Sequence, residues 1–229
     1  MVKVERSFPA PPSLAREARK KSGSYKCPDV IEQLEKDFHN KCYLCEISPV
    51  QDPEVEHLLP HEGGKYKDRM FDWENLFWSC GHCNSIKNNA AYRNGILNCC
   101  KTDPEEHIRF ELLDGNVVIT ARNETEPLIG ITVQLLDEVY NKKNTGMRTV
   151  ASQVRVDELC LEMDTLFRML DRYHKNRTDR VTLRTLRGLL NRSQCFAAFK
   201  REYVRAHESM YPELIAMLAA EEKGTTPKD

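Results

Sequence analysis

The chain contains Cys42-Tyr43-Leu44-Cys45 and, after a gap of 34 residues, Cys80-Gly81-His82-Cys83. Each CxxC pair places two thiolates on one tight turn, and two such turns complete a tetrahedral sulfur site for zinc. The gap is longer than that of a common zinc ribbon, so further structure must lie within the loop. We therefore predict a structural zinc that supplies folding free energy to a small unit, bound by Cys42, Cys45, Cys80 and Cys83.

Polar residues suited to hydrolysis lie within this loop. His57 can accept a proton from water near neutral pH, although a zinc ligand or a half-buried histidine would give the same pattern. Glu56 offers a hard oxygen ligand for Mg²⁺ or Mn²⁺, or is a solvated surface carboxylate. Because neighbouring strand residues point to opposite faces, the two side chains can serve one site only if the strand turns or bulges there.

Four short segments resemble the HNH endonucleases. They are Cys42–Cys45, Val55-Glu56-His57-Leu58, Trp73-Glu74-Asn75-Leu76 and Cys80–Lys87. The resemblance covers about residues 40–90 and implies a ββα-metal hairpin in which His57 is the general base. It also implies that Glu56 and Asn84 hold a catalytic Mg²⁺ or Mn²⁺, and that Asn75 hydrogen-bonds the hairpin loop and orients His57. The alternatives are a helix N-cap for Asn84 and an ordinary turn asparagine for Asn75.

A weaker likeness extends over the whole chain. The residues that carry it are Val4-Glu5-Arg6, Pro11-Pro12-Ser13-Leu14, Phe71-Asp72-Trp73 and the helical C-terminal region. They resemble the PtuB-type HNH proteins of bacterial antiviral systems such as Septu and some retrons. This resemblance implies a role in defence against phage and an ATPase partner of the PtuA type.

The overall composition restricts where the protein acts and how it could bind nucleic acid. With 34 basic and 35 acidic residues the chain has a net charge of −1, so a nuclease of this composition needs local basic patches. Nine cysteines, an odd number, and no secretory segment favour a reducing compartment, and we expect a cytoplasmic protein. We expect no membrane span, because no apolar run approaches the roughly 18 residues that a span needs.

One such patch is predicted in the C-terminal half, where residues 168–205 hold eleven Lys or Arg and three acids. Its arginines at steps of three, four and three share one helix face: Arg177, Arg180, Arg184 and Arg187. This row could follow a phosphate backbone, although a solvated face or a docking surface for an acidic partner protein would have the same pattern. Between the CxxC pairs, His61 could coordinate a metal or contact a phosphate, or could be a bystander histidine. Lys87 could reach a phosphate, or could be an exposed helix lysine.

The periodicity predicts an α+β, mostly helical fold. Together with the HNH resemblance it divides the chain into residues 1–104, with N-terminal helices and the HNH module that the resemblance implies, and 105–229, a hairpin and helical region for docking of substrate or partner. Short helices are expected over 14–21, capped by Ser13, and from Asp29, which would cap the second. Strands are expected over 54–59 and 70–78 and a helix over 84–92, with both tryptophans in the core. Further along we expect a hairpin (110–113 and 117–120), helices over 128–140 and 147–174, two or three more helices, and a disordered tail from 224.

In the long helix over 147–174, the residues expected on the apolar face are Val150, Val154, Leu161 and Leu166. From these observations together we expect a metal-dependent HNH endonuclease that cuts nucleic acid, with DNA as the favoured substrate. The alternative is a non-catalytic zinc-knuckle module that binds nucleic acid or protein.

Overall fold

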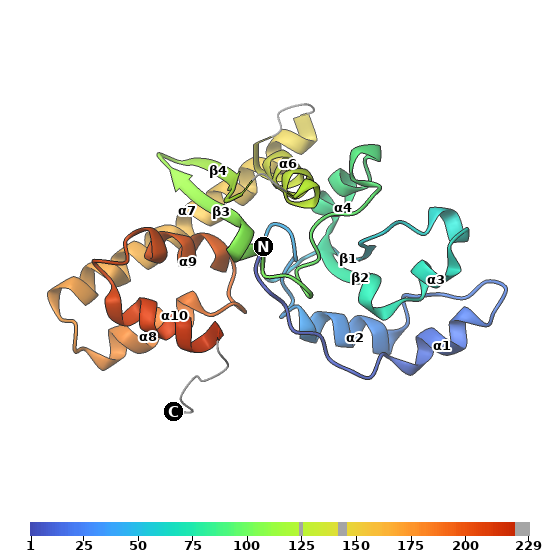
Figure 1. Ribbon diagram of the computed structural model, residues 1–229, viewed down its shortest axis with the longest axis horizontal. Helices are drawn as coiled ribbons and strands as arrows, with labels where there is room; N and C mark the ends of the chain where they lie inside the picture. The colour runs from blue at the N-terminus through green and yellow to red at the C-terminus, as the bar shows by residue number, and fades with distance from the viewer. Residues whose placement is uncertain (124–125, 142–145, 223–229) are drawn as a thin grey trace.

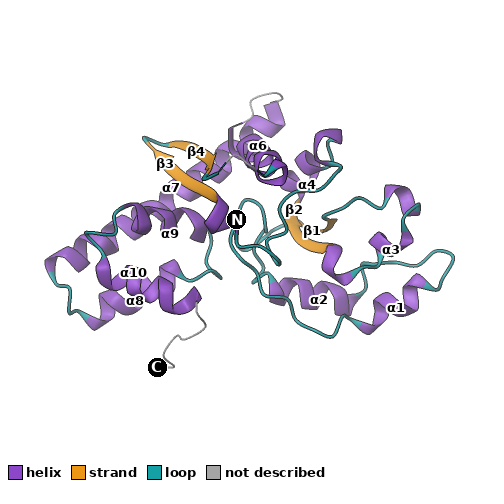
Figure 2. Ribbon diagram, in the orientation of Figure 1, coloured by secondary structure: helices purple, strands orange, loops and turns teal. Residues whose placement is uncertain are grey.

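The structure is a computed structural model that describes residues 1–123, 126–141 and 146–222. The fold is α+β and mostly helical, with two small antiparallel sheets (Figures 1 and 2). The elements up to α4 form one half of the molecule, on the right in Figure 1, and α7 to α10 form the other. The expected tail from 224 lies outside the described residues.

The two N-terminal helices are α1 (Pro12–Ala18) and α2 (Pro28–Asp37). Both begin at a proline, whose fixed φ suits the first helical turn, so neither Ser13 nor Asp29 is the N-cap that the sequence predicts. Asp29 instead joins the helices, because its Oδ2 accepts a hydrogen bond of 3.1 Å from the backbone N–H of Ser13.

The chain between the two CxxC pairs, residues 46–79, forms most of the first sheet, which consists of β1 (Pro53–His57) and β2 (Leu76–Cys80). They pair antiparallel with Pro53 opposite Cys80 and His57 opposite Leu76. The second strand begins at Leu76, later than the predicted start at residue 70, because the chain between the strands forms short helical turns. These turns are η1 (Glu62–Gly64), α3 (Lys67–Met70) and η2 (Trp73–Asn75).

Helix α4 (Gly81–Lys87) follows β2 without a linker. It begins three residues before the predicted start, so Asn84 lies inside the helix and Cys80 occupies the N-cap position. It also ends earlier, because the Asn89 side chain accepts a hydrogen bond from the Ala91 N–H and starts a separate turn, η3 (Ala90–Tyr92). The order strand, strand, helix agrees with the order that the sequence predicts.

The predicted hairpin is present as β3 (Ile108–Leu113) and β4 (Asn116–Ala121), preceded by the short helix α5 (Pro104–His107). Asp114 and Gly115 have φ of 50° and 76°, which are the positive angles that a tight two-residue hairpin turn requires. The remaining helices are α6 (Pro127–Asn141), α7 (Gly146–Lys175), α8 (Arg180–Leu190), α9 (Ala197–Ala206) and α10 (Pro212–Glu222).

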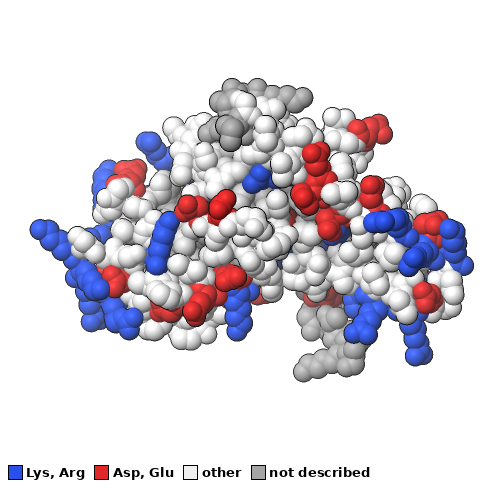
Figure 3. Space-filling model, turned by 180° about the vertical axis from the view of Figure 1, so that it is seen from behind, with Lys and Arg blue, Asp and Glu red and all other residues white. Residues whose placement is uncertain are grey.

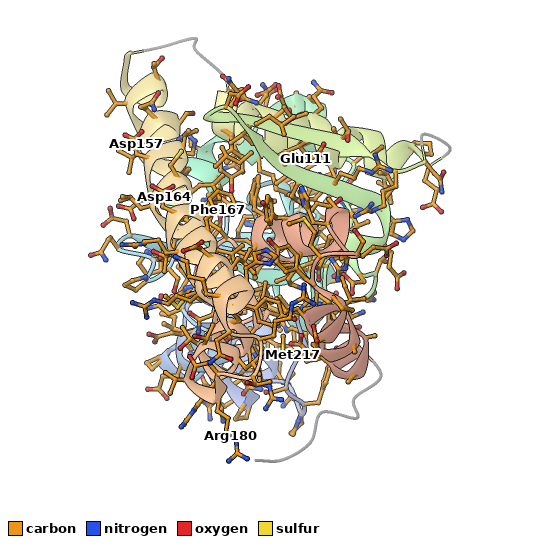
Figure 4. The ribbon with its side chains drawn as sticks, turned by 90° about the vertical axis from the view of Figure 1, so that its left-hand side faces the viewer. Glu111, Asp157, Asp164, Phe167, Arg180 and Met217 are labelled. Carbon is orange, nitrogen blue, oxygen red and sulfur yellow. The ribbon has the colours of Figure 1, made fainter. Side chains whose placement is uncertain are left out.

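The apolar face predicted for α7 is wrong. Val150, Val154 and Leu161 are 60%, 46% and 61% exposed, whereas only Leu166 of the predicted set is buried. The buried stripe is instead made of Leu159, Met163, Leu166 and Leu170. Figure 4 looks toward α7, along which the exposed Asp157 precedes Leu161 and the exposed Asp164 follows it. The helix has two apolar stripes, and its packing against α8 and α9 decides which one is covered.

The two halves share one hydrophobic core, and both tryptophans belong to it as predicted. Lys41, buried beside the first CxxC pair, donates to the carbonyl oxygens of Arg192 at 2.5 Å and Gln194 at 3.0 Å. Tyr140 of α6 donates to the carbonyl oxygen of Cys45 at 2.8 Å. Within the described residues, none of the helices is both long and apolar enough to cross a membrane.

Candidate metal centre and adjoining cleft

The two CxxC pairs meet in a buried cluster. The sulfur atoms of Cys42, Cys45, Cys80 and Cys83 lie within 4.8 Å of one another. The Sγ atoms of Cys45 and Cys80 are 3.8 Å apart, the separation that a tetrahedral zinc with bonds of about 2.3 Å imposes on its ligands. This cluster can hold a metal such as zinc, and the spacing of the cysteines in the sequence is sufficient to find it.

The second half of the molecule supplies a positive charge to the cluster. Arg155 of α7 is buried, and its guanidinium donates a hydrogen bond of 3.0 Å to the Sγ of Cys80. Hydrogen bonds from the other three cysteines lower the pKa of the Cys80 thiol, and Arg155 lowers that pKa further. Four thiolates around a divalent ion carry a net charge of −2, so a buried arginine at this point stabilises the loaded site.

His57, at the end of β1, lies beside a cleft of about 410 Å³. Its Nε2 is 3.1 Å from the carbonyl oxygen of Met70. A carbonyl can only accept, so this contact places the proton on Nε2 and leaves a lone pair on Nδ1. Burial lowers the pKa of His57 to about 4, which keeps the ring neutral at physiological pH.

Asn75 holds the loop that orients His57. Its Oδ1 accepts from the N–H of Leu59 at 2.8 Å, and its Nδ2 donates to the carbonyl oxygens of Leu59 and Arg69, both at 2.9 Å. These bonds fix the chain just after β1 and just before Met70.

Glu56 and Lys87 form a buried ion pair at the base of the cleft. Oε1 of the carboxylate lies 2.5 Å from the Lys87 ammonium, and Oε2 accepts from the Tyr43 hydroxyl at 2.8 Å. Lys87 also donates to the carbonyl oxygens of His57 and Leu58, each at 2.9 Å. The two side chains are only 2% and 4% exposed, so Lys87 is not the exposed helix lysine that the sequence left open.

Asn84 and His61 both line the same cleft. Within the described part of the chain the Asn84 side chain makes no hydrogen bond, and it is not the cap of α4, so its amide is available to a ligand. The Nδ1 of His61 accepts from the N–H of Gly64 at 2.9 Å. The proton of a neutral His61 is therefore on Nε2, which makes this ring a hydrogen-bond donor rather than a metal ligand.

The predicted arginine row does not line this cleft. Arg177 precedes α8 and lies over the Tyr173 ring at 5.6 Å, whereas Arg180, Arg184 and Arg187 are exposed on α8. The basic region is also smaller than predicted, because at least four of its eleven cations form ion pairs with carboxylates of other elements: Arg192, Lys200, Arg201 and Arg205. Lys175 pairs with Asp171 on the surface of α7.

Three residues of the site are missed by the sequence analysis. Tyr25 packs its ring edge against His57 at 4.5 Å, Tyr43 binds Glu56, and Arg155 binds Cys80. Tyr43 lies between two predicted zinc ligands, so its position was a usable signal. Tyr25 and Arg155 are 32 and 75 residues from their partners, and no local pattern marks them.

Parts of the chain are similar in sequence to known proteins. No protein-family model matches the chain. It is 33% identical over 76 residues to Septu protein PtuB of Bacillus thuringiensis, a match that covers 31% of this chain and 29% of that protein. It is 32% identical over 120 residues to Septu protein PtuB of Bacillus mycoides (strain KBAB4), covering 38% of this chain and 40% of that protein.

These matches show a partial similarity to Septu protein PtuB. The chain spans less than half the length of either relative.

Proposed function

We propose that this protein is an HNH-type nuclease that hydrolyses phosphodiester bonds of nucleic acid, with DNA as the expected substrate. The observation that carries the proposal is the orientation of His57, whose Nε2 is engaged by the Met70 carbonyl while Asn75 fixes the same loop. His61 and Asn84 line the same cleft. A general base, a hydrogen-bond donor and an amide oxygen thus lie together.

The proposed reaction begins with a water molecule between Nδ1 of His57 and the scissile phosphate. Nδ1 accepts a proton from this water as its oxygen attacks phosphorus, and the bond to the leaving oxygen breaks. A pKa of about 4 makes His57 a weak base in the free protein. A bound phosphate carries negative charge, which raises the pKa of the ring toward neutrality and strengthens it as a base.

The hydrogen-bond donor is the neighbouring His61, whose ring lies 4.6 Å from that of His57 and whose Nε2 carries the proton when Nδ1 accepts from Gly64. We propose that this N–H donates to a phosphate oxygen. A donor fixed by the fold stabilises charge that develops in the transition state without reorganising.

A catalytic Mg²⁺ or Mn²⁺ would stabilise charge on the phosphate and the leaving oxygen. The residues fit such an ion in part. Asn84 offers an amide oxygen to the cleft, and ions of this kind commonly take water and substrate phosphate as further ligands. Glu56 is the second candidate ligand, but both of its oxygens are bonded to Lys87 and Tyr43, so the ion would have to compete with Lys87 for it.

The biological setting we propose is defence against phage together with an ATPase partner of the PtuA type. The partial similarity to Septu protein PtuB supports this setting. The partner assignment depends on that similarity and on the resemblance described above.

The nuclease proposal is tested by His57→Ala in a plasmid-nicking assay with Mg²⁺ or Mn²⁺. Loss of a general base should lower the cleavage rate by about 10²- to 10⁴-fold, while zinc content and thermal stability stay unchanged. The matched control is His107→Ala, which removes an imidazole outside the cleft. Full nicking activity in the His57 variant would remove this residue from the mechanism.

A second candidate function is a non-catalytic zinc-stabilised module that binds nucleic acid or protein. The contacts of Glu56 favour this candidate, because both carboxylate oxygens are already bonded to Lys87 and Tyr43. Of the two predicted ion ligands, Asn84 alone then has a side chain without a bond inside the described fold. Binding of plasmid without nicking, both alone and with the ATPase, would support this candidate over the nuclease.

A further inference from the structure

A basic surface lies at the end of the molecule formed by α1 and α3. Residues 14–26 hold five cations and one acid, and all five cations are exposed: Arg16, Arg19, Lys20, Lys21 and Lys26. In Figure 3 basic side chains gather at this end, on the left of the view, and a second group lies at the opposite end. Acidic residues elsewhere offset both groups, so the net charge of the chain is only −1.

Three of these five cations have no side-chain partner within the described residues. Arg16, Arg19 and Lys21 make no side-chain hydrogen bond or ion pair within the part of the chain that the structure describes. Lys20 pairs with Glu17, and Lys26 pairs with Glu54 at 2.8 Å. Like charges held close together without partners repel one another and destabilise a fold slightly. An anionic ligand would offset this repulsion.

This basic segment runs directly into the cleft that holds His57. Tyr25 and Lys26 line the cleft, and the Tyr25 ring lies 4.5 Å from His57 and 5.8 Å from His61. The segment is also held in place against the β1–β2 loop. Lys67 donates to the carbonyl oxygen of Lys20 at 3.3 Å, and Gly23 packs so closely on Phe71 that a side-chain carbon there would lie 3.1 Å from its ring.

The arginines of α8 lack this connection. Arg180 and Arg184 border a separate cavity with Leu214 and Met217 of α10, and none of the predicted catalytic residues lines it. In Figure 1, α8 and α10 lie at the opposite end of the molecule from α1 and α3. Of these two basic groups, the one at the α1 end adjoins the cleft, which the exposed Arg93 also lines.

We propose that the phosphodiester backbone of the nucleic-acid substrate lies along Arg16, Arg19 and Lys21 and enters the cleft past Tyr25 and Lys26. This inference rests on the proposed nuclease function and names the surface that delivers the strand to it. Phosphate contacts of this kind position a strand without reading its sequence. Each contact releases condensed counterions, so binding weakens as salt rises.

The test compares two variants with equal loss of charge. Arg16→Gln/Arg19→Gln/Lys21→Gln removes the proposed track, and Arg172→Gln/Arg180→Gln/Arg184→Gln removes three exposed arginines around α8 that also have no partner within the described residues. Each is made in the full chain carrying His57→Ala, so that the probe stays uncut. Binding of a fluorescein-labelled DNA duplex, and of an RNA duplex of the same sequence, is followed by anisotropy across a salt series.

For the track variant, the slope of log Kd against log salt should fall by about 2 to 3 for the DNA duplex. When salt rises from about 50 to 200 mM, the factor by which Kd increases should then be roughly 40-fold smaller for the track variant than for the parent. The α8 variant should keep the parent slope. The reverse pattern, an equal loss in both variants, or no binding of either probe by the parent would overturn the proposal.

Cleavage by the same triple variants with His57 intact separates this inference from the proposed function. Slower nicking by the track variant alone supports both. Parent-like nicking by the track variant refutes the track and leaves the nuclease standing. A parent chain that binds through the track but never cuts refutes the nuclease and leaves the track standing, and the DNA and RNA probes show which backbone it accepts.

Discussion

Glu56 and Lys87 have separate predicted roles in the sequence, one as an ion ligand and the other as a phosphate contact. In the structure the two side chains form one buried ion pair. Lys87 also ties that pair to the backbone of β1 through His57 and Leu58. Because both groups are nearly inaccessible to water, removing one charge leaves the other buried and unpaired.

We therefore expect Glu56→Gln to lower the free energy of unfolding by about 3–5 kcal/mol, measured by urea denaturation of the zinc-loaded protein. The double variant Glu56→Gln/Lys87→Met should recover much of this loss, because no buried charge remains. A Glu56→Gln protein as stable as the parent, but with a weakened requirement for Mg²⁺, would instead identify Glu56 as an ion ligand.

At the scale of elements, the four-cysteine cluster joins the end of β2, the start of α4 and the first CxxC turn. These short elements bury little area of their own. A bound zinc contributes folding free energy on the order of 10 kcal/mol in small domains, so we expect the β1–β2–α4 unit to depend on it. The hairpin β3–β4 packs on α6 and α9 and has separate support.

Cys83→Ser should consequently raise hydrogen exchange over β1, β2 and α4, with much smaller changes in β3 and β4. Hydrogen-exchange mass spectrometry of zinc-loaded parent and variant measures this difference. Cys27→Ser is the matched control, because Cys27 lies outside the cluster and serine is a favourable residue at its N-cap position in α2. Unchanged protection and full zinc content in the Cys83 variant would contradict a four-cysteine site.

The helices show what a local pattern can and cannot predict. The existence of α6 and α7 follows from their apolar periodicity, and their observed ends lie within one residue of the predicted ones. The choice of buried face in α7 does not follow, because Val150, Val154 and Leu161 form a stripe as regular as that of Leu159, Met163 and Leu166. Neighbouring helices select between two such stripes, and their positions are not encoded locally.

At the scale of the whole molecule, one buried carboxylate organises the second half. Glu105 of α5 accepts hydrogen bonds from Arg192, Arg201 and Arg205, which follow it by 87 to 100 residues. Burial alone would raise the pKa of Glu105, but these arginines, Arg201 foremost, lower it to about 2. The same contacts remove three cations from the basic region that the sequence predicts.

This shift sets a pH dependence of stability. The folded pKa of about 2 lies below the ordinary 4.5, so the contribution is complete above about pH 4.5 and is lost as pH falls toward 2. We expect a loss of about 3 kcal/mol over this window, measured by urea unfolding at several pH values. Glu105→Gln should be less stable at neutral pH and should lack this part of the acid dependence, whereas Glu74→Gln, at an exposed position, should behave like the parent.

The amino-acid sequence alone is enough to predict the features that depend on short spacings. These are the four clustered cysteines, the hairpin with its positive-φ turn, and the order of strands and helix around the CxxC pairs. Backbone geometry fixes each of these within a few residues. Only the folded arrangement shows that Arg19 stays exposed while Arg201 is buried in an ion pair with Glu105. It also selects the partners of Glu56 and Cys80. Those outcomes depend on contacts between residues far apart in the chain, where the free energy of packing selects among pairings that look equivalent in the sequence.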